Sequence, residues 1–244
     1  MSDEVLAGRN RAERDGDHGG FAAFRASAAY DALMRLPIVL YNGYFLVREL
    51  RGLAAWVADQ PLPFSLTPLS ATVLASRVAL ILFLALLIGF HLTRRRPIAK
   101  SRGWRPRLVA LLGATLTVAM VLLDRTPGSI AINAASAVLI LAGNYISIVA
   151  VLSLGRSLSI MPEARRLVTT GPYSLVRHPL YLAEEIAILG VWLQFMSWPA
   201  TAILVGHFVI QLWRLGYEEE VLGASFPDYA AYAARTARLI PGIY

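Results

Sequence analysis

A strongly apolar run at residues 70–92 restricts the possible folds more than any other feature of the chain. Arg77 is its only Asp, Glu, Lys or Arg residue. A helix needs about 20 predominantly apolar residues to cross the hydrocarbon core of a bilayer. Backbone polar groups in that core must be hydrogen-bonded internally, which a helix achieves within one segment. The run therefore predicts a membrane-spanning helix.

Further apolar runs and the composition extend this prediction to the rest of the chain. The 244 residues are 57% hydrophobic and 16% charged, whereas a soluble domain has about 25% charged residues. We expect additional spans at residues 106–123, 130–153, 179–197 and 199–216. The last two ranges are separated by the sequence SWP and predict a helical hairpin with short arms. The expected fold is an all-α, polytopic membrane protein with about five or six transmembrane helices, including this hairpin, and a cytoplasmic C-terminal helix.

The N-terminal part of the chain allows two interpretations. Residues 33–50 are apolar but contain charged residues such as Arg35 and Glu49. They predict either a first span or an amphipathic helix that lies in the membrane interface. Residues 1–29 are expected to form a mobile or interfacial arm. Residues 30–130 would then form the N-terminal membrane helices, and residues 131–244 the functional core.

Basic residues gather in regions that the predicted spans place on one side of the membrane. The chain has a formal net charge of +7, and its basic residues cluster within 94–107, 156–177 and 214–238. Connectors rich in arginine and lysine normally face the cytoplasm. We therefore expect a protein of the bacterial cytoplasmic membrane, with a cytoplasmic C-terminus, contacts to membrane lipids and no nucleic-acid partner.

The composition also excludes several kinds of site. The chain contains no cysteine, which excludes disulfides, thiolate metal ligands and a cysteine nucleophile. Its four histidines do not have the spacing of a known metal motif. No strand followed by a glycine-rich dinucleotide fingerprint is present.

One polar cluster, TGPYSLVRHPLY at residues 170–181, lies at the entrance to the predicted hairpin. Gly171 and Pro172 predict a turn, and Pro179 is suited to the first turn of a helix. His178 is then placed at a helix entrance, where free backbone N–H groups attract an anion. Arg177 adds a planar donor that binds carboxylates through two hydrogen bonds. The cluster therefore predicts a site for an anionic group.

Two acidic features accompany this cluster. Glu218, Glu219 and Glu220 contradict the basic character of the other cytoplasmic flanks, and carboxylates suit a cationic ligand. Glu184 and Glu185 lie about 8–9 Å into the first arm of the hairpin, at 1.5 Å per residue. They are either solvated at the headgroup level or directed into a polar cavity.

These clusters resemble the isoprenylcysteine carboxyl methyltransferase family and the wider group that includes membrane phospholipid N-methyltransferases. The resemblance covers about residues 140–244. Members show a Gly-x-Tyr, Arg-His-Pro-x-Tyr element, then a helical hairpin, then paired glutamates with spaced Leu, Phe and Tyr residues and a late arginine. The matching stretches are GPYSLVRHPLY at 171–181, EEEVLGASFPDYAAY at 218–232 and the ending RTARLIPGIY.

The resemblance implies an S-adenosylmethionine-dependent methyltransferase of the EC 2.1.1 type, with S-adenosylhomocysteine as the product and a membrane-embedded or lipid-linked acceptor. It implies that the cofactor is bound at the cytoplasmic face. The expected cofactor-binding residues are Tyr173, Arg177, His178, Pro179, Tyr181, Leu182, Glu218 and Glu219. Methyl transfer from an activated donor needs alignment and desolvation more than a nucleophilic side chain. Arg235 aligns with the late arginine of the family, and Arg238 is the alternative. The expected catalytic residues are Arg235 and Glu219.

The acceptor and the enzyme class leave alternatives open. The acceptor is a carboxylate, as in isoprenylcysteine methyltransferases, or a lipid amine. The adjacent Glu184 and Glu185 depart from the glycine that family members usually have near this point, which favours a different or basic acceptor. An NADPH-dependent sterol-type reductase shares a similar Arg-His-Pro hairpin but is normally longer. A non-enzymatic scaffold or transporter is disfavoured because the polar residues gather on one face.

Overall fold

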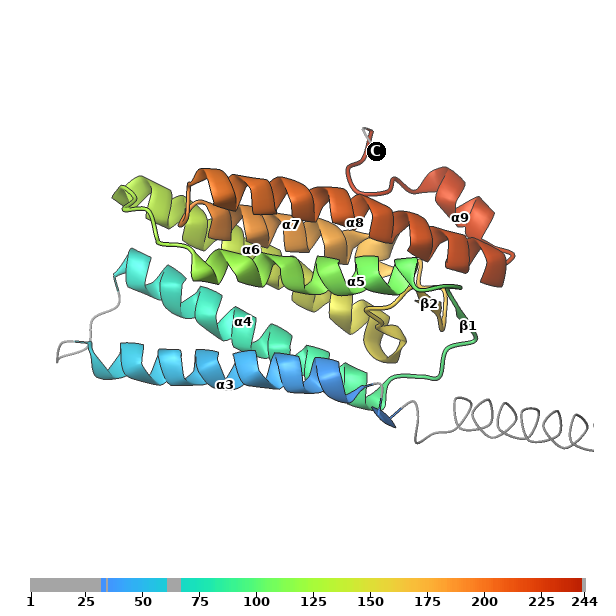
Figure 1. Ribbon diagram of the computed structural model, residues 1–244, viewed down its shortest axis with the longest axis horizontal. Coiled ribbons are helices and arrows are strands. Elements are labelled where there is room, and N and C mark those ends of the chain that lie inside the picture. Colours follow the sequence, from blue (N-terminus) through green and yellow to red (C-terminus); the bar gives the residue numbers. More distant parts are fainter. Residues whose placement is uncertain (1–31, 34, 61–66, 243–244) are drawn as a thin grey trace, which may run out of the picture.

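The computed structural model describes residues 32–33, 35–60 and 67–242. The predicted N-terminal arm, residues 1–29, lies outside these ranges. The helices are α3 (Leu36–Ala58), α4 (Pro68–Thr93), α5 (Arg105–Thr115), α6 (Ile130–Leu154), α7 (Pro179–Trp192), α8 (Trp198–Ser225) and α9 (Tyr229–Arg235). The predicted all-α class, the C-terminal hairpin (α7 and α8) and the final helix are confirmed (Figure 1).

Proline residues and side-chain caps explain where several of these helices begin. Pro68 and Pro179 each occupy the first turn of their helix, where the missing N–H has no intrahelical partner to lose. The side chains of Thr67, Ser129 and Ser197 accept hydrogen bonds from the first turns of α4, α6 and α8. These caps satisfy N–H groups that the helix itself leaves without partners.

The helices differ in how well they suit a bilayer. Within the described residues, Ser70–Thr93 and Ile130–Ser157 are long and apolar enough to cross a membrane. The region predicted as one span at 106–123 is two elements, because α5 ends at Thr115 and a 3₁₀-helix, η1 (Leu116–Leu122), follows. Residues 33–50, which were interpreted either as a first span or as an interfacial helix, fall largely within α3, a helix of 23 residues.

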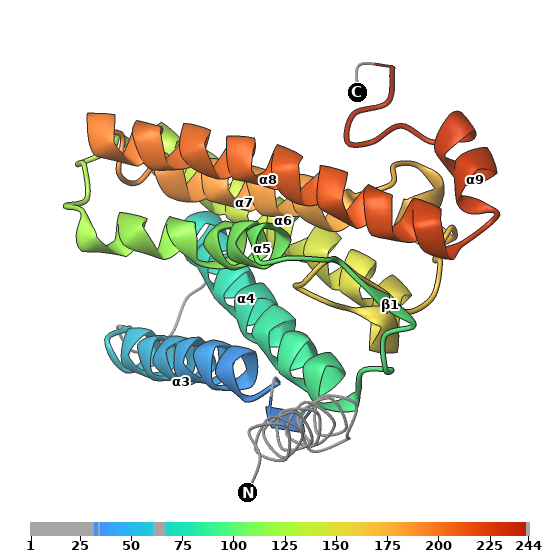
Figure 2. The ribbon, with the colours of Figure 1, turned by 45° about the vertical axis from the view of Figure 1, so that its right-hand side comes forward.

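Helix α6 is the centre of the bundle and packs against α4 on one side and α7 on the other. The contact with α7 is close because two glycines lie in it. A Cβ at Gly143 would lie 2.7 Å from the carbonyl oxygen of Ala183, and one at Gly190 would lie 2.9 Å from that of Ser136. Helix α3 packs on α4, and α5 packs on α8 (Figure 2).

The basic connectors are joined at one end of the bundle. Strands β1 (Ala99–Lys100) and β2 (Glu163–Ala164) pair in antiparallel fashion. Two short 3₁₀-helices, η2 (Gly155–Ser157) and η3 (Gly171–Ser174), belong to the same region of loops between α6 and α7. At the other end, the backbone N–H of Thr126 donates to the carbonyl of Gln194 at 3.0 Å and ties the connectors before α6 and α8.

Candidate functional site

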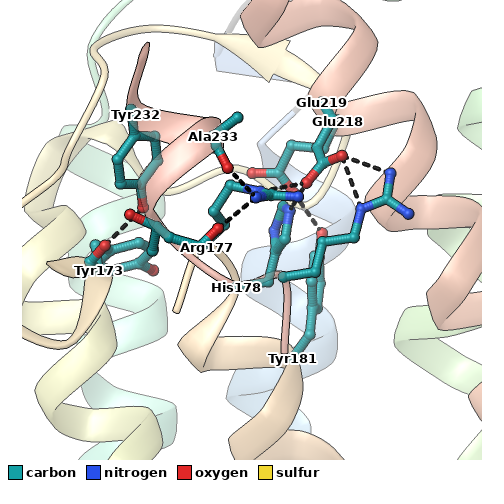
Figure 3. Close-up of polar contacts among 10 residues, drawn as sticks. Tyr173, Arg177, His178, Tyr181, Glu218, Glu219, Tyr232 and Ala233 are labelled. Atoms are coloured by element: carbon teal, nitrogen blue, oxygen red, sulfur yellow. Dashed lines mark hydrogen bonds and ion pairs between the residues drawn. The ribbon is translucent and has the colours of Figure 1, made fainter. Parts of the chain in front are cut away.

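A carboxylate, Glu219 on α8, is the centre of a polar cluster at the loop end of the bundle. Arg177 Nε donates to Glu219 Oε1 at 2.8 Å, and His178 Nε2 lies 3.1 Å from the same oxygen. Arg238 Nε donates to Glu219 Oε2 at 2.8 Å. Three segments that are far apart in the sequence therefore meet at one side chain (Figure 3).

These contacts set the charge state of Glu219. Burial acts to raise the pKa of this carboxyl group, but the hydrogen bonds from His178, Arg238 and Arg177 outweigh it and hold the pKa well below its usual value. Glu219 is therefore an anion across the physiological pH range. Both of its oxygens are occupied by cationic donors, so its main contact is with the protein itself.

The C-terminal segment is attached beside the Arg-His-Pro loop by backbone and side-chain bonds. The N–H of Arg177 donates to the carbonyl of Ala237 at 2.8 Å, and that of His178 donates to the carbonyl of Arg238 at 3.1 Å. Arg177 Nη1 also donates to the carbonyl of Ala233 at 2.8 Å and to that of Thr236. The guanidinium of Arg177 thus caps carbonyl groups at the C-terminal end of α9 and fixes the position of the chain that follows.

A second carboxylate, Glu218, takes a different direction from Glu219. It accepts a hydrogen bond from the hydroxyl of Tyr181 at 2.8 Å, as Figure 3 shows. The ring of Tyr181 stacks on the imidazole of His178, with centroids 5.6 Å apart. The Glu218 carboxylate and the Tyr181 ring are therefore placed side by side.

Two further tyrosines join α9 to the turn that precedes α7. The hydroxyl of Tyr232 donates to the carbonyl of Tyr173 at 2.7 Å. Burial raises the pKa of Tyr232 to about 12 and raises that of Tyr173 well above its usual value. Both rings remain neutral, so they offer aromatic surface rather than charge.

A cavity of about 350 Å³ opens next to these residues, a size within the range of small-molecule sites. Five of the residues expected to bind a cofactor line it: Tyr173, Arg177, His178, Tyr181 and Glu218. The other three do not. Pro179 is buried in the first turn of α7, Leu182 packs with Leu215 and Leu239, and Glu219 joins the arginines instead.

The two late arginines have different surroundings. Arg235 is exposed at the end of α9 and does not line the cavity. Arg238 pairs with Glu219 through two of its nitrogens. The structure therefore brings Arg238, and not Arg235, into the polar cluster.

Sequence reasoning left the hairpin residues without a function, and the structure joins them in a buried polar network. Gln211 Nε2 donates to Glu184 Oε2 at 2.7 Å, and Arg214 Nη1 donates to Gln211 Oε1 at 2.7 Å. The Arg214 guanidinium carbon lies 4.7 Å from the centre of the Tyr181 ring, within the range of a cation–π interaction. The sequence does show polar residues at every third or fourth position of 207–214, which places them on one face of the helix. It does not show which residues of α7 they contact, because that depends on how the two arms of the hairpin pack.

The same hairpin carries a second pair, which ties it to α5. His207 Nδ1 lies 2.8 Å from Glu185 Oε1, and its Nε2 lies 3.0 Å from the carbonyl oxygen of Gly113. Both ring nitrogens therefore face oxygen atoms, one on α7 and one on α5. Gly113 has no side chain to obstruct this contact, and a Cβ there would collide with Arg214 Cδ.

Comparisons with known proteins show what the second half of the chain is similar to. Residues 132–228 match the phospholipid methyltransferase family. The chain is 41% identical over 76 residues to the cobalt-zinc-cadmium resistance protein CzcN of Cupriavidus metallidurans, which covers 31% of this chain and 35% of that protein. It is 36% identical over 80 residues to the nickel-cobalt-cadmium resistance protein NccN of Alcaligenes xylosoxydans xylosoxydans, which covers 32% and 38%.

The matched regions thus span little more than a third of the length of these curated relatives. Within the described residues, no group of three or more His, Asp or Glu side chains is arranged to hold a metal ion. The family match includes nearly all of α6, the loops between α6 and α7, and the hairpin with Glu218 and Glu219. The resemblance to membrane methyltransferases is therefore confirmed by the family match over residues 132–228.

Proposed function

We propose that this protein transfers the methyl group of S-adenosylmethionine to a membrane-embedded or lipid-linked acceptor. The observation that carries the proposal is the convergence of five residues on one cavity. Glu218, His178, Tyr173 and Tyr181 lie within the segment that matches the family, and Tyr232 on α9 follows it. The residues Tyr173, Tyr181 and Tyr232 supply the aromatic surface.

The chemistry of these residues suits the parts of the proposed cofactor. A carboxylate such as Glu218 accepts hydrogen bonds from a ribose diol or an ammonium group. Neutral aromatic rings attract a sulfonium cation and stack on adenine. Arg166 is exposed and also lines the cavity, so it is suited to the carboxylate of the cofactor. When bound, the cofactor supplies an activated methyl group.

Arg177 has a different role in this proposal from the one its motif predicts. Its guanidinium donates to Glu219 and to two backbone carbonyls. We therefore assign it to the positioning of the C-terminal segment that closes the cofactor site. Replacing Arg177 by alanine should weaken cofactor binding by loosening the wall of the site.

Ligand-dependent melting tests the proposal. Detergent-purified protein is titrated with S-adenosylhomocysteine and, in parallel, with NADPH, and the melting temperature is recorded. A ligand at 100 times its dissociation constant stabilises the folded state by about 2.7 kcal/mol, which corresponds to roughly 5–11 °C for a chain of this size. Saturable stabilisation by S-adenosylhomocysteine alone is expected. Stabilisation by NADPH alone, or by neither ligand, refutes the proposal.

A further inference from the structure

Glu184 occupies a position in the cavity that no part of the proposed cofactor site uses. It lies three residues after Tyr181 on α7, about 4.5 Å further along the helix axis. Both side chains line the cavity, and so do Ala187 and Ile188 on the next turn. Arg214 and His207 on α8 line it as well. The cavity therefore extends along the hairpin, away from the polar cluster around Glu219. Glu184 lies between the two ends of the cavity.

Neighbouring side chains hold the Glu184 carboxylate in one orientation. Its Oε2 accepts from Gln211 Nε2 at 2.7 Å and lies 3.8 Å from Arg214 Nη1. Gln211 and Arg214 are 2% and 4% exposed, whereas the Glu184 side chain is 29% exposed. Oε1 makes no hydrogen bond within the described part of the chain. One oxygen is thus anchored to the protein, and the other is available to a molecule in the cavity.

Two buried donors in the cavity wall indicate that this region receives a polar ligand. Asn144 is 5% exposed, and its Nδ2 has no hydrogen-bond partner among the described residues. The same is true of Arg214 Nε. Both residues line the cavity, and a buried donor without a partner costs about 1–3 kcal/mol. Asn144 directly follows Gly143, which faces Ala187 and Ala183 on α7, and Ala183 is the residue before Glu184.

The part of the cavity wall that α4 contributes is mostly apolar, with Leu80, Phe83, Leu84 and Leu87 beside His91. Helix α3 adds Ile38, Tyr41 and Asn42. An acceptor with a polar head and an apolar chain fits this lining. Its head would meet Glu184 while its chain contacted the side chains of α3 and α4.

We propose that Glu184 binds the head group of a lipid acceptor whose reacting atom carries a proton, and that it takes up this proton during transfer. This inference rests on the proposed methyltransferase function. The bond between the methyl carbon and sulfur breaks, with its electron pair left on sulfur, as the bond to the acceptor atom forms. The proton of that atom passes to Glu184 Oε1, and charge balances because a sulfonium and a carboxylate become a thioether and a carboxylic acid.

The charges around the cavity oppose a carboxylate as the reacting group. Such an acceptor would place a second negative charge beside Glu184, and like charges at contact distance repel. Arg214 is the nearest cation, and it is already 3.8 Å from Glu184 Oε2 and directed to Gln211. An amine, hydroxyl or thiol head group donates a hydrogen bond to Glu184 instead.

The test separates acceptor binding from cofactor binding. Purified protein and radiolabelled S-adenosylmethionine are incubated with vesicles of phosphatidylethanolamine and phosphatidylglycerol, which carry N–H and O–H groups, and separately with N-acetyl-S-farnesylcysteine, which carries a carboxylate. Label is expected in the vesicle lipid. Glu184→Gln should lower kcat by about 100-fold or more, as loss of a general base does, and leave stabilisation by S-adenosylhomocysteine unchanged. Glu184→Asp should recover part of the loss.

The adjacent Glu185 provides a matched control. It is bonded to His207 and does not line the cavity, so Glu185→Gln should lower the melting temperature and leave kcat at the wild-type level. Label only in the farnesylcysteine, or in neither probe while S-adenosylhomocysteine still binds, overturns the proposal. So does an unchanged kcat in Glu184→Gln. Failure of S-adenosylhomocysteine to bind wild-type protein counts against the proposed function itself.

Discussion

Glu219 lies among Arg177, His178 and Arg238, and these contacts make it an anchor for the C-terminal segment. The predicted topology placed Glu219 and the Arg-His-Pro triplet on one face of the membrane, and the structure brings them into contact. The sequence did not reveal that Glu218 and Glu219 face different partners. A helix turns about 100° per residue, so which of two adjacent glutamates faces the cavity depends on how α8 is rotated in the bundle.

Glu219→Gln should destabilise the protein in a pH-dependent manner. The pKa of Glu219 is lower in the folded protein than its unfolded value of about 4.3. The ionised carboxylate therefore adds stability above about pH 4.3, and this contribution is lost as the pH falls towards the folded pKa. At pH 7 the free energy of unfolding of the variant should be about 3 kcal/mol lower, because Arg177 and Arg238 lose the negative charge with which they pair.

Melting curves of both proteins between pH 2 and pH 8 measure this difference, because the contribution is lost only below about pH 4.3. The gap in melting temperature should be largest near neutral pH and should shrink in the acidic range. A gap of the same size at every pH would show that packing, and not ionisation, is what the substitution removes. Arg235→Ala is the control, because Arg235 is exposed and its removal should leave the melting temperature near that of the wild type.

Helix contacts explain which elements were predictable. Apolar length and proline positions correctly predicted α4, α6 and the hairpin. They did not predict that the region 106–123 changes from α-helix to 3₁₀-helix after Thr115. Neither Thr115 nor Leu116 is a proline or glycine, so the sequence does not mark the point of change. They also did not predict the α6–α7 contact, which depends on Gly143 and Gly190 facing the partner helix.

Gly143→Ala should destabilise the bundle, whereas Gly89→Ala should not. A Cβ at Gly143 would lie 2.6 Å from the backbone nitrogen of Ala187, and backbone atoms have little room to move. The expected loss is about 1–3 kcal/mol, as for other overpacked sites. No neighbouring atom of the described residues lies within 4 Å of a Cβ at Gly89 in α4, so alanine there should stabilise the helix by up to about 1 kcal/mol.

Thermal unfolding in the same detergent compares the two glycine variants directly. Equal melting temperatures for both would contradict the close approach of α6 and α7. Because Asn144 follows Gly143 and lines the cavity, Gly143→Ala should also weaken stabilisation by a bound ligand more than Gly89→Ala does.

At the scale of the whole molecule, charge and chemistry are separated along the bundle. The polar cluster and the paired strands β1 and β2 lie where the basic connectors meet (Figure 1). Among the described residues at the opposite end, a backbone bond from Thr126 to Gln194 joins the connectors before α6 and α8. The distribution of basic residues along the sequence predicted this polarity, since two expected crossings separate each basic region from the next.

The absence of cysteine from the chain makes the orientation in the membrane directly measurable. Single substitutions Arg102→Cys, Asp124→Cys and Arg235→Cys place a thiol at exposed positions. Asp124 lies at the end of the bundle opposite the other two. A membrane-impermeant maleimide applied to intact bacterial cells should label Asp124→Cys alone, and it should label all three variants after the membrane is permeabilised. Labelling of Arg102→Cys and Arg235→Cys but not Asp124→Cys in intact cells would reverse the orientation. Equal labelling of all three in intact cells would show that α6 does not cross the membrane, because Asp124 and the loop cluster would then share one side.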